Sequence, residues 1–305
     1  MTAIPSLEKT TPDTMDGRDG RSRRGLRLGR WLQVPYWIVL LFFAVLFIYP
    51  FVWLISASFK TRAHVFDNKL IPVDATLHNF SKVWDVAPLA RWLLNSLIVG
   101  TLAGGTVTIS SAIVAFGFAY FRFRARGFLF GLVLATMMLP GAVTMIPVYV
   151  IWKELGFLGT QVPLWAANLF GSAFYIFLLR QFFLTIPREL FEAARVDGCS
   201  YWGMFRRIAL PLSWPSLVIV FVFEFQASWN DLMKPLIYLG NKTGLYTVPL
   251  GLNSLFVQFN PIAGGHGDFQ YIVTASLITT IPMIALFMVG QRYFVEGIAT
   301  QGRKG

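Results

Sequence analysis

Cysteine is nearly missing from this chain, since Cys199 is the only one among its 305 residues. One thiol cannot form a disulfide within the chain and cannot supply a cysteine-based metal site. Histidine is scarce as well: His64, His78 and His266 are scattered without the spacing of metal ligands. The sequence therefore excludes a disulfide framework and indicates no metal centre.

Charged residues are also few, at 13% of the chain, whereas 55% of the residues are hydrophobic. A soluble domain usually has about 25% charged residues, so this composition is typical of a membrane protein. The net charge of +11 would by itself suggest nucleic acid as a partner. The positions of the basic residues along the chain give a different explanation, described below.

Long stretches of the chain contain no charged residue: 31–59, 92–121, 127–152, 155–179 and 269–291. A sixth stretch, between Ile208 and Asn230, contains only Glu224. About 20 apolar residues are enough to cross a bilayer as a helix. We therefore predict an all-α membrane protein with a six-helix transmembrane domain over residues 36–291. Its spans are expected near 36–57, 93–117, 128–150, 164–182, 212–233 and 270–291.

The first 35 residues are polar at their start and carry a basic cluster at Lys9, Arg18, Arg21, Arg23, Arg24, Arg27 and Arg30. Such a segment cannot bury a core, and we expect a disordered tail. A cleavable signal peptide is disfavoured because both the leader and the apolar run after it are too long. A nucleic-acid patch is the weaker interpretation because a span follows at once.

The distribution of Lys and Arg predicts the orientation of the chain. With the N-terminus inside, 18 of the 26 basic residues fall on the inner side of the six spans. Because basic loops stay in the cytoplasm, we expect both termini there, including the C-terminal tail at 292–305. This asymmetry accounts for the net charge without nucleic acid, and it predicts a multi-pass membrane protein.

The longest polar interruption in the second half of the chain runs from Glu192 to Pro215. Pro187 suits the first turn of a helix, and Gly198 suits its left-handed C-terminal position. Ser200 is expected to cap a second helix, which Pro211 would stop. The pattern predicts two short helices joined at Gly198, an arrangement called the elbow below.

The spacing within the elbow is more specific than that of an ordinary two-helix loop. Glu192-Ala193-Ala194 is followed after three residues by Gly198, then after nine by Ile208, and then by Leu210-Pro211. This run resembles the EAA loop of permease subunits in bacterial binding-protein-dependent ABC importers. Further matches are Leu77–Phe80, Leu94–Ser96, Met138–Pro140, Trp229–Asp231 and Gly302–Gly305, which resemble the carbohydrate-uptake branch and the six-span permease of maltose transporters.

The resemblance implies a type I ABC importer permease fold with a cytoplasmic EAA coupling loop. It also implies partners: a second permease in a heterodimer, two ATPase subunits that hold ATP and magnesium, and an extracytoplasmic solute-binding protein. No cofactor is then expected in this chain. The resemblance also implies a place in the bacterial cytoplasmic membrane. The residues expected to couple this chain to the ATPase are Glu192, Ala193, Ala194, Asp197, Gly198, Phe205, Ile208, Leu210 and Pro211.

One acidic residue, Glu224, is expected deep within a span, with Asn230 toward its outer end. An intramembrane charge faces the bundle interior or a water-filled path. Both residues are candidates for the translocation path, and a structural hydrogen bond is an equally open alternative for Glu224. The pairs Gly100/Gly104 and Gly127/Gly131 are spaced for close helix packing, although glycine is common in membrane helices.

No phosphate-binding Gly-x-x-x-x-Gly-Lys-Ser/Thr run occurs, and no set of residues indicates catalysis. We therefore expect a transport subunit that is not an enzyme and that takes up a sugar or sugar-like solute. A glycerophosphodiester, a polyol or a peptide is the alternative solute. A stand-alone secondary transporter is less favoured, because the sequence has one deep acid and no evident repeats.

Overall fold

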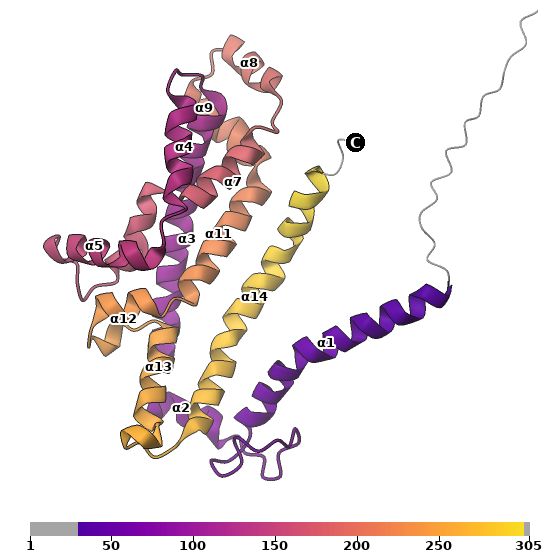
Figure 1. Ribbon diagram of the computed structural model, residues 1–305, viewed down its shortest axis with the longest axis vertical. Coiled ribbons are helices and arrows are strands. Elements are labelled where there is room, and N and C mark those ends of the chain that lie inside the picture. Colours follow the sequence, from indigo (N-terminus) through magenta and orange to yellow (C-terminus); the bar gives the residue numbers. More distant parts are fainter. Residues whose placement is uncertain (1–29, 302–305) are drawn as a thin grey trace, which may run out of the picture. The chain divides into compact units, whose positions relative to one another are not determined.

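The computed structural model describes the backbone of residues 30–301 and the side chains of 34–262 and 264–293 (Figure 1). The basic tail expected over 1–35 falls almost wholly outside the described residues, as do the last four residues of the C-terminal tail. Every regular element in the described part is helical. Residues 1–50 and 51–305 form two units, and the second contains all the features discussed below.

The elements follow one another in the order α1 (Arg30–Ser58), α2 (His78–Val86), α3 (Leu89–Tyr120), α4 (Arg126–Thr136), α5 (Gly141–Glu154), α6 (Val162–Trp165), η1 (Ala166–Phe170), α7 (Ala173–Phe183), α8 (Arg188–Val196), α9 (Tyr201–Met204), η2 (Phe205–Ala209), α10 (Leu210–Leu212), α11 (Trp214–Trp229), α12 (Met233–Leu239), η3 (Thr243–Leu245), α13 (Val248–Phe259), η4 (Pro261–Ala263) and α14 (Phe269–Gln301). The η2 segment is a π-helix, and the other η segments are 3-10 helices.

Three helical stretches are long and apolar enough to cross a membrane without a break: Val34–Ser58, Leu89–Tyr120 and Phe269–Tyr293. Three pairs of shorter helices pass the same test together but are bent by more than 40° between their members. The described residues therefore contain three unbroken spans, and six if each bent pair is one span.

The chain bends sharply within the expected span near 128–150. α4 and α5 meet at an angle of 96°. The bend falls at Pro140, which has an extended backbone conformation and directly precedes α5. Proline has no N–H to donate to a helix and disfavours helical geometry at the residue before it, so the helix ends there.

The expected fifth span, near 212–233, also differs from the structure at both ends. α11 begins at Trp214 and ends at Trp229, and an angle of 79° separates it from the preceding helical run, Tyr201–Leu212. The fourth apolar segment is bent by 42° between η1 and α7, where Gly171 has a φ of +79°. A positive φ is accessible to glycine without a steric cost.

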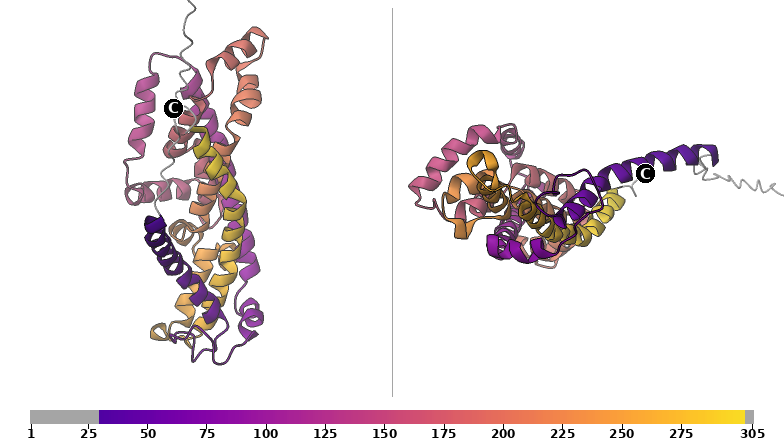
Figure 2. Two further views of the ribbon diagram at one scale, coloured as in Figure 1. Left: turned by 90° about the vertical axis from the view of Figure 1, so that its right-hand side faces the viewer. Right: turned by 90° about the horizontal axis from the view of Figure 1, so that it is seen from below.

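Helix α3 is central to the second unit and packs against α7 and α11, and α11 packs against α14 (Figure 2). The close approach of α3 and α11 depends on Gly100 and Gly104. A Cβ at Gly100 would lie 3.0 Å from the Phe225 ring, and a Cβ at Gly104 would lie 2.9 Å from the Phe221 ring. The close-packing interpretation is confirmed for this pair. At Gly127 and Gly131 a Cβ would meet nothing within 4 Å, so neither glycine packs against another described helix of this chain.

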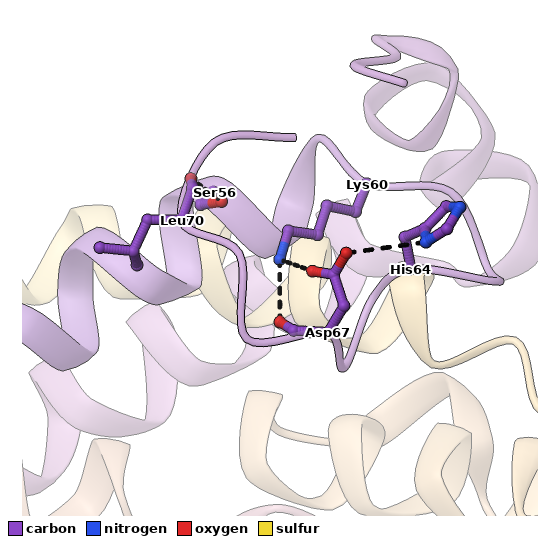
Figure 3. Close-up of polar contacts among 5 residues, drawn as sticks. All are labelled: Ser56, Lys60, His64, Asp67 and Leu70. Atoms are coloured by element: carbon purple, nitrogen blue, oxygen red, sulfur yellow. Dashed lines mark hydrogen bonds and ion pairs between the residues drawn. The ribbon is translucent and has the colours of Figure 1, made fainter. Parts of the chain in front are cut away.

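The α2 end of the second unit contains a buried ion pair (Figure 3). The Lys60 side chain is 1% exposed, and its Nζ pairs with the Asp67 carboxylate and donates to the Asp67 backbone oxygen at 3.1 Å. His64 Nδ1 lies 3.6 Å from the other carboxylate oxygen. Ser56 Oγ donates to the carbonyl of Leu70. These bonds close the loop after α1 on itself.

Asn79, one of the residues that carried the family resemblance, is buried in the same region. Its Nδ2 donates to the carbonyls of Ser58 at 2.9 Å and Lys60 at 2.8 Å. Both carbonyls lie at the C-terminal end of α1, where helix carbonyls have no partner within the helix. Asn79 therefore acts as a cap supplied by α2.

Asn95 and Ser96 connect α3 to the long segment between α11 and α14. Asn95 Nδ2 donates to the carbonyls of Gly244 at 3.1 Å and Tyr246 at 2.9 Å. Ser96 Oγ accepts from the backbone N–H of Val248 at 2.8 Å. The segment is thus fixed to a long helix by side chains 149 to 152 residues away in sequence.

Candidate functional site

The elbow lies at the opposite end of α3 from α2, and α8 and α9 mark it in Figure 1. Its first helix, α8, follows Pro187, which lies just before the helix rather than in its first turn. Glu189 occupies the first turn and Arg195 the last. These charges complement the positive N-terminal and negative C-terminal ends of the helix dipole.

The end of α8 depends on Gly198, as the sequence predicts. Gly198 has a φ of +76°. Its N–H donates to the Arg195 carbonyl at 3.1 Å, and the N–H of Cys199 donates to the Ala194 carbonyl at 2.9 Å. This pair of bonds defines a Schellman motif. A Cβ at Gly198 would meet nothing within 4 Å, so the requirement for glycine is conformational only.

The second helix begins with the predicted serine cap. A further residue, Gly203, also takes part in this turn. Ser200 Oγ accepts a hydrogen bond from the N–H of Gly203 at 3.1 Å. A Cβ at Gly203 would lie 2.7 Å from Cys199 Sγ, so a larger residue there would require the Cys199 side chain to move. Sequence reasoning missed Gly203. The available signal was its position three residues after the capping serine.

The expectation that Pro211 stops the second helix is wrong. The helical run continues through η2 and α10 as far as Leu212. In the π-helical segment the N–H of Leu210 donates to the carbonyl of Phe205, five residues earlier. A wider turn of this kind relieves the clash that a proline ring makes with a carbonyl one α-helical turn before it. The break follows at Ser213 instead.

An aromatic cluster attaches the elbow to the last turns of α3. Phe191 and Phe205 are both buried, and their ring centroids lie 6.0 and 5.2 Å from that of Phe116. Phe191 also meets Tyr120 edge to face at 5.2 Å. Phe205, one of the expected ATPase-coupling residues, has its side chain turned into this cluster, where it anchors the elbow.

The other elbow residues face outward or lie at the edge of the cluster. Glu192, Ala193, Asp197, Gly198 and Pro211 are exposed, and Ala194, Ile208 and Leu210 are half-buried. Large apolar side chains are exposed beside them: Val196 is 88% exposed and Trp202 is 60% exposed. Exposed apolar side chains gathered around a polar motif are typical of a surface that contacts another protein.

A cleft of about 430 Å³ lies between the elbow and the ends of α3 and α7. Its wall combines the rings of the aromatic cluster with Arg122, Arg188, Arg195 and Glu192. Two of the arginines and Glu192 come from α8. The cleft therefore offers both charge signs and apolar surface directly beside the EAA-like residues.

The deep acid Glu224 lies on α11 and is half-buried. Its Oε1 accepts a hydrogen bond from Nδ2 of Asn168 at 2.7 Å. Asn168 belongs to η1, and the sequence analysis did not single it out. Asn230 is not part of this contact: it lies exposed after α11, and its Nδ2 donates to the Gln226 carbonyl at 2.9 Å. The structure thus pairs Glu224 with Asn168 and leaves Asn230 apart.

No group of three or more His, Cys, Asp or Glu side chains placed to hold a metal ion occurs among the residues whose positions are described.

Comparisons with known proteins agree with this architecture. The family described as "Binding-protein-dependent transport system inner membrane component" matches residues 104–300. The arabinooligosaccharides transport system permease protein AraQ of Halalkalibacterium halodurans is 30% identical, with 87% of this chain and 94% of AraQ covered. The sn-glycerol-3-phosphate transport system permease protein UgpE of Salmonella typhi is 33% identical, with 91% and 97% covered.

One solved structure shares the fold. It is a bacterial ABC transporter involved in the import of the acidic polysaccharide alginate, with a TM-score of 0.76 and 22% identity over 88% of this chain and 98% of that one. The family match covers more than half of the chain and includes the elbow, α11 and α14. This chain therefore belongs to the family of inner membrane components of binding-protein-dependent transport systems.

Proposed function

We propose that this chain is the permease subunit of an ATP-driven ABC importer for a sugar or sugar-like solute, and that its elbow receives the movement generated by a separate ATPase. The observation that carries the proposal is the construction of the elbow. Its inner side is packed onto α3 through Phe191 and Phe205, while its motif residues Glu192, Ala193 and Asp197 are exposed.

This arrangement can pass a displacement from one protein to another as a rigid body. A partner that grips the exposed face moves Phe205 and Phe191, and these move the end of α3. Closure of the ATPase would then bias the bundle between inward-open and outward-open states. Glu192 and Asp197 are available for basic residues of that partner, and Ala193 and Gly198 permit its close approach.

The proposed assembly contains a second permease, two ATPase subunits and an extracytoplasmic solute-binding protein. The described end of α14 lies toward the elbow end of the second unit (Figure 1). Together with the excess of basic residues on one side of the spans, this supports a cytoplasmic elbow and cytoplasmic termini. The segment between α11 and α14, held by Asn95 and Ser96, then faces the binding protein.

A sugar is favoured because AraQ is named for arabino-oligosaccharides. A phosphorylated polyol is the second candidate, because UgpE is named for sn-glycerol 3-phosphate and is equally similar. A transporter that works alone would need its own energy coupling, typically through several intramembrane charges. Among the described residues, the spans contain two acids: Glu154, the last residue of α5, and Glu224, which lies within α11.

Reconstitution tests the proposal. Proteoliposomes containing this chain, the companion permease, the ATPase and the binding protein should accumulate labelled arabinotriose or sn-glycerol 3-phosphate only when ATP is hydrolysed. Omission of the ATPase or of the binding protein should abolish accumulation. Gradient-driven uptake by this chain alone would overturn the proposal.

Coupling at the elbow is tested by a pair of charge reversals on α8. Glu192→Arg should reduce co-purification of the ATPase with the permease. Glu189→Arg is the matched control, because Glu189 is an exposed acid of the same helix outside the motif. Equal retention of the ATPase by both variants would refute a contact at Glu192.

A further inference from the structure

The fourth apolar segment is broken at membrane depth. Helix α6 and the 3-10 turn η1 lead to Gly171, where the chain takes a φ of +79° before α7 begins at Ala173. Irregular backbone at this depth is tolerated where it is buried in protein or lines a water-filled cavity. In transporters, breaks of this kind often form the place where the solute binds.

Four hydrogen bonds hold the break in place. Ser110 Oγ donates to the Asn168 carbonyl at 2.8 Å, and the Ser172 N–H donates to Ser111 Oγ at 3.1 Å. Asn168 Nδ2 donates to the Ala103 carbonyl at 3.2 Å and to Glu224 Oε1 at 2.7 Å. The Asn168 side chain therefore has a fixed orientation, and it links η1 to both α3 and α11.

These bonds leave acceptor atoms available. Both hydrogens of the Asn168 amide are used, whereas its Oδ1 accepts no hydrogen bond from the described residues. The Tyr175 hydroxyl also interacts with the Glu224 carboxylate. A carboxylate has about four lone-pair sites, however, so it retains capacity for further donors. Asn168 and Glu224 are both half-buried, so neither is sealed off from solvent within this chain.

A pair of hydrogen-bond acceptors that includes a carboxylate favours some classes of solute over others. Hydroxyl groups can donate to both oxygens, and a hydrogen bond to a carboxylate is about twice as strong as one between neutral groups. A phosphate group brings negative charge and acceptor oxygens, so it would be repelled and would find no donor. The pair is thus suited to a neutral compound that carries several hydroxyl groups.

We infer that Asn168 Oδ1 and the Glu224 carboxylate form a solute-binding pair that accepts hydrogen bonds from the hydroxyl groups of a neutral polyhydroxylated solute and disfavours phosphorylated ones. This inference rests on the proposed transport function and names the class of solute. Asn168 positions Glu224 and contributes an acceptor of its own.

The test uses cysteine labelling in the assembled importer without its binding protein. The only native cysteine is replaced in Cys199→Ser, and Ala167→Cys adds a reporter at an exposed position beside Asn168. Arabinotriose should slow the reaction of this cysteine with a methanethiosulfonate reagent, and sn-glycerol 3-phosphate at equal concentration should not. In Glu224→Gln, the arabinotriose concentration needed for half-protection should rise at least tenfold.

Thr108→Val is the matched control, because Thr108 Oγ1 donates only to the Gly104 carbonyl of its own helix. In the Thr108→Val variant, arabinotriose should protect the reporter cysteine to the same extent as in the parent importer. Absence of protection by arabinotriose, or equal protection by sn-glycerol 3-phosphate, would overturn the inference.

If the Glu224→Gln variant assembles poorly, a second variant and a second measurement test the same inference. Asn168→Ala, which retains the carboxylate, should lower the number of arabinotriose molecules imported per ATP hydrolysed at least fivefold while hydrolysis stimulated by the binding protein continues. An unchanged ratio would contradict the pair. Failure of the parent importer to accumulate any solute with ATP would instead overturn the proposed function, so the two failures can be told apart.

Discussion

Phe205 of the elbow packs on Phe116 of α3, with ring centroids 5.2 Å apart and ring planes at 47°. Phe205 belongs to the π-helical segment after Gly198. Phe116 lies one turn before the end of α3, an unbroken span of 32 residues. This contact makes the elbow and α3 one mechanical piece. The predictions below follow from it, from the backbone conformation of Gly198 and from two other contacts.

Phe205→Ala should destabilise the fold and weaken coupling. Removal of a buried phenylalanine side chain lowers the free energy of unfolding by about 3–5 kcal/mol through lost burial and the cavity that remains. Trp202→Ala is the control for stability, since Trp202 is 60% exposed. Thermal unfolding of the purified permease should show a large loss for the first variant and little for the second. Equal losses would mean that Phe205 is not an anchor.

Gly198→Val should uncouple ATP hydrolysis from uptake. The left-handed conformation at Gly198 costs a residue with a side chain about 1–2 kcal/mol, and a β-branched residue is the least tolerant. Because no other atom of this chain surrounds the position, the effect on the stability of this chain comes from the backbone alone, and Gly198→Asn should unfold at nearly the same temperature as the parent. Transport and assembly like those of the parent in the valine variant would contradict the elbow geometry.

Gly104→Val should loosen the contact between α3 and α11. Its first side-chain atom would lie 2.9 Å from the Phe221 ring and 3.0 Å from the Phe221 backbone oxygen, which cannot rotate away. Overpacking of this kind costs about 1–3 kcal/mol. Gly131→Val has no neighbour within 4 Å and should unfold at the same temperature as the parent. The measurement is thermal unfolding in detergent of both variants side by side.

Acid should weaken the α2 end of the second unit through Asp67. The Lys60 ammonium, by its hydrogen bond, holds the pKa of the Asp67 carboxyl below its ordinary value. A carboxyl group with a lowered folded-state pKa stabilises the fold above its ordinary pKa. That contribution is lost as pH falls through the lowered value, which lies below about 4.

Asp67→Asn should therefore remove part of the acid-dependent loss of stability and lower stability at neutral pH, where Lys60 is left buried without its partner. Thermal unfolding between pH 3 and pH 7 measures both effects. His64→Gln, made alone, removes the weaker contact to Asp67 and should leave the acid transition in place. A transition in Asp67→Asn identical to that of the parent would show that another group causes it.

Rules that use only neighbouring residues predicted the structure correctly at positions where a single backbone conformation is possible. Gly198 ends α8 in a left-handed conformation and Ser200 caps α9, as their residue types require. The same level of reasoning failed at Pro211, because the sequence carries no local signal for the π-helical turn that precedes it. Nor did it foresee the 96° bend between α4 and α5, because composition predicts a helix but not the angle at which two helices meet.

By itself, the sequence determined that the chain is helical and apolar enough to cross a membrane several times, where its polar elbow lies and how that elbow is capped. These properties depend on composition and on neighbours within a few residues. Only the tertiary structure decided that Phe205 points inward, that Gly100 and Gly104 carry the packing of α3 on α11, and that Glu224 pairs with Asn168. Each of these contacts joins residues far apart in the chain, and their distances depend on how the helices pack.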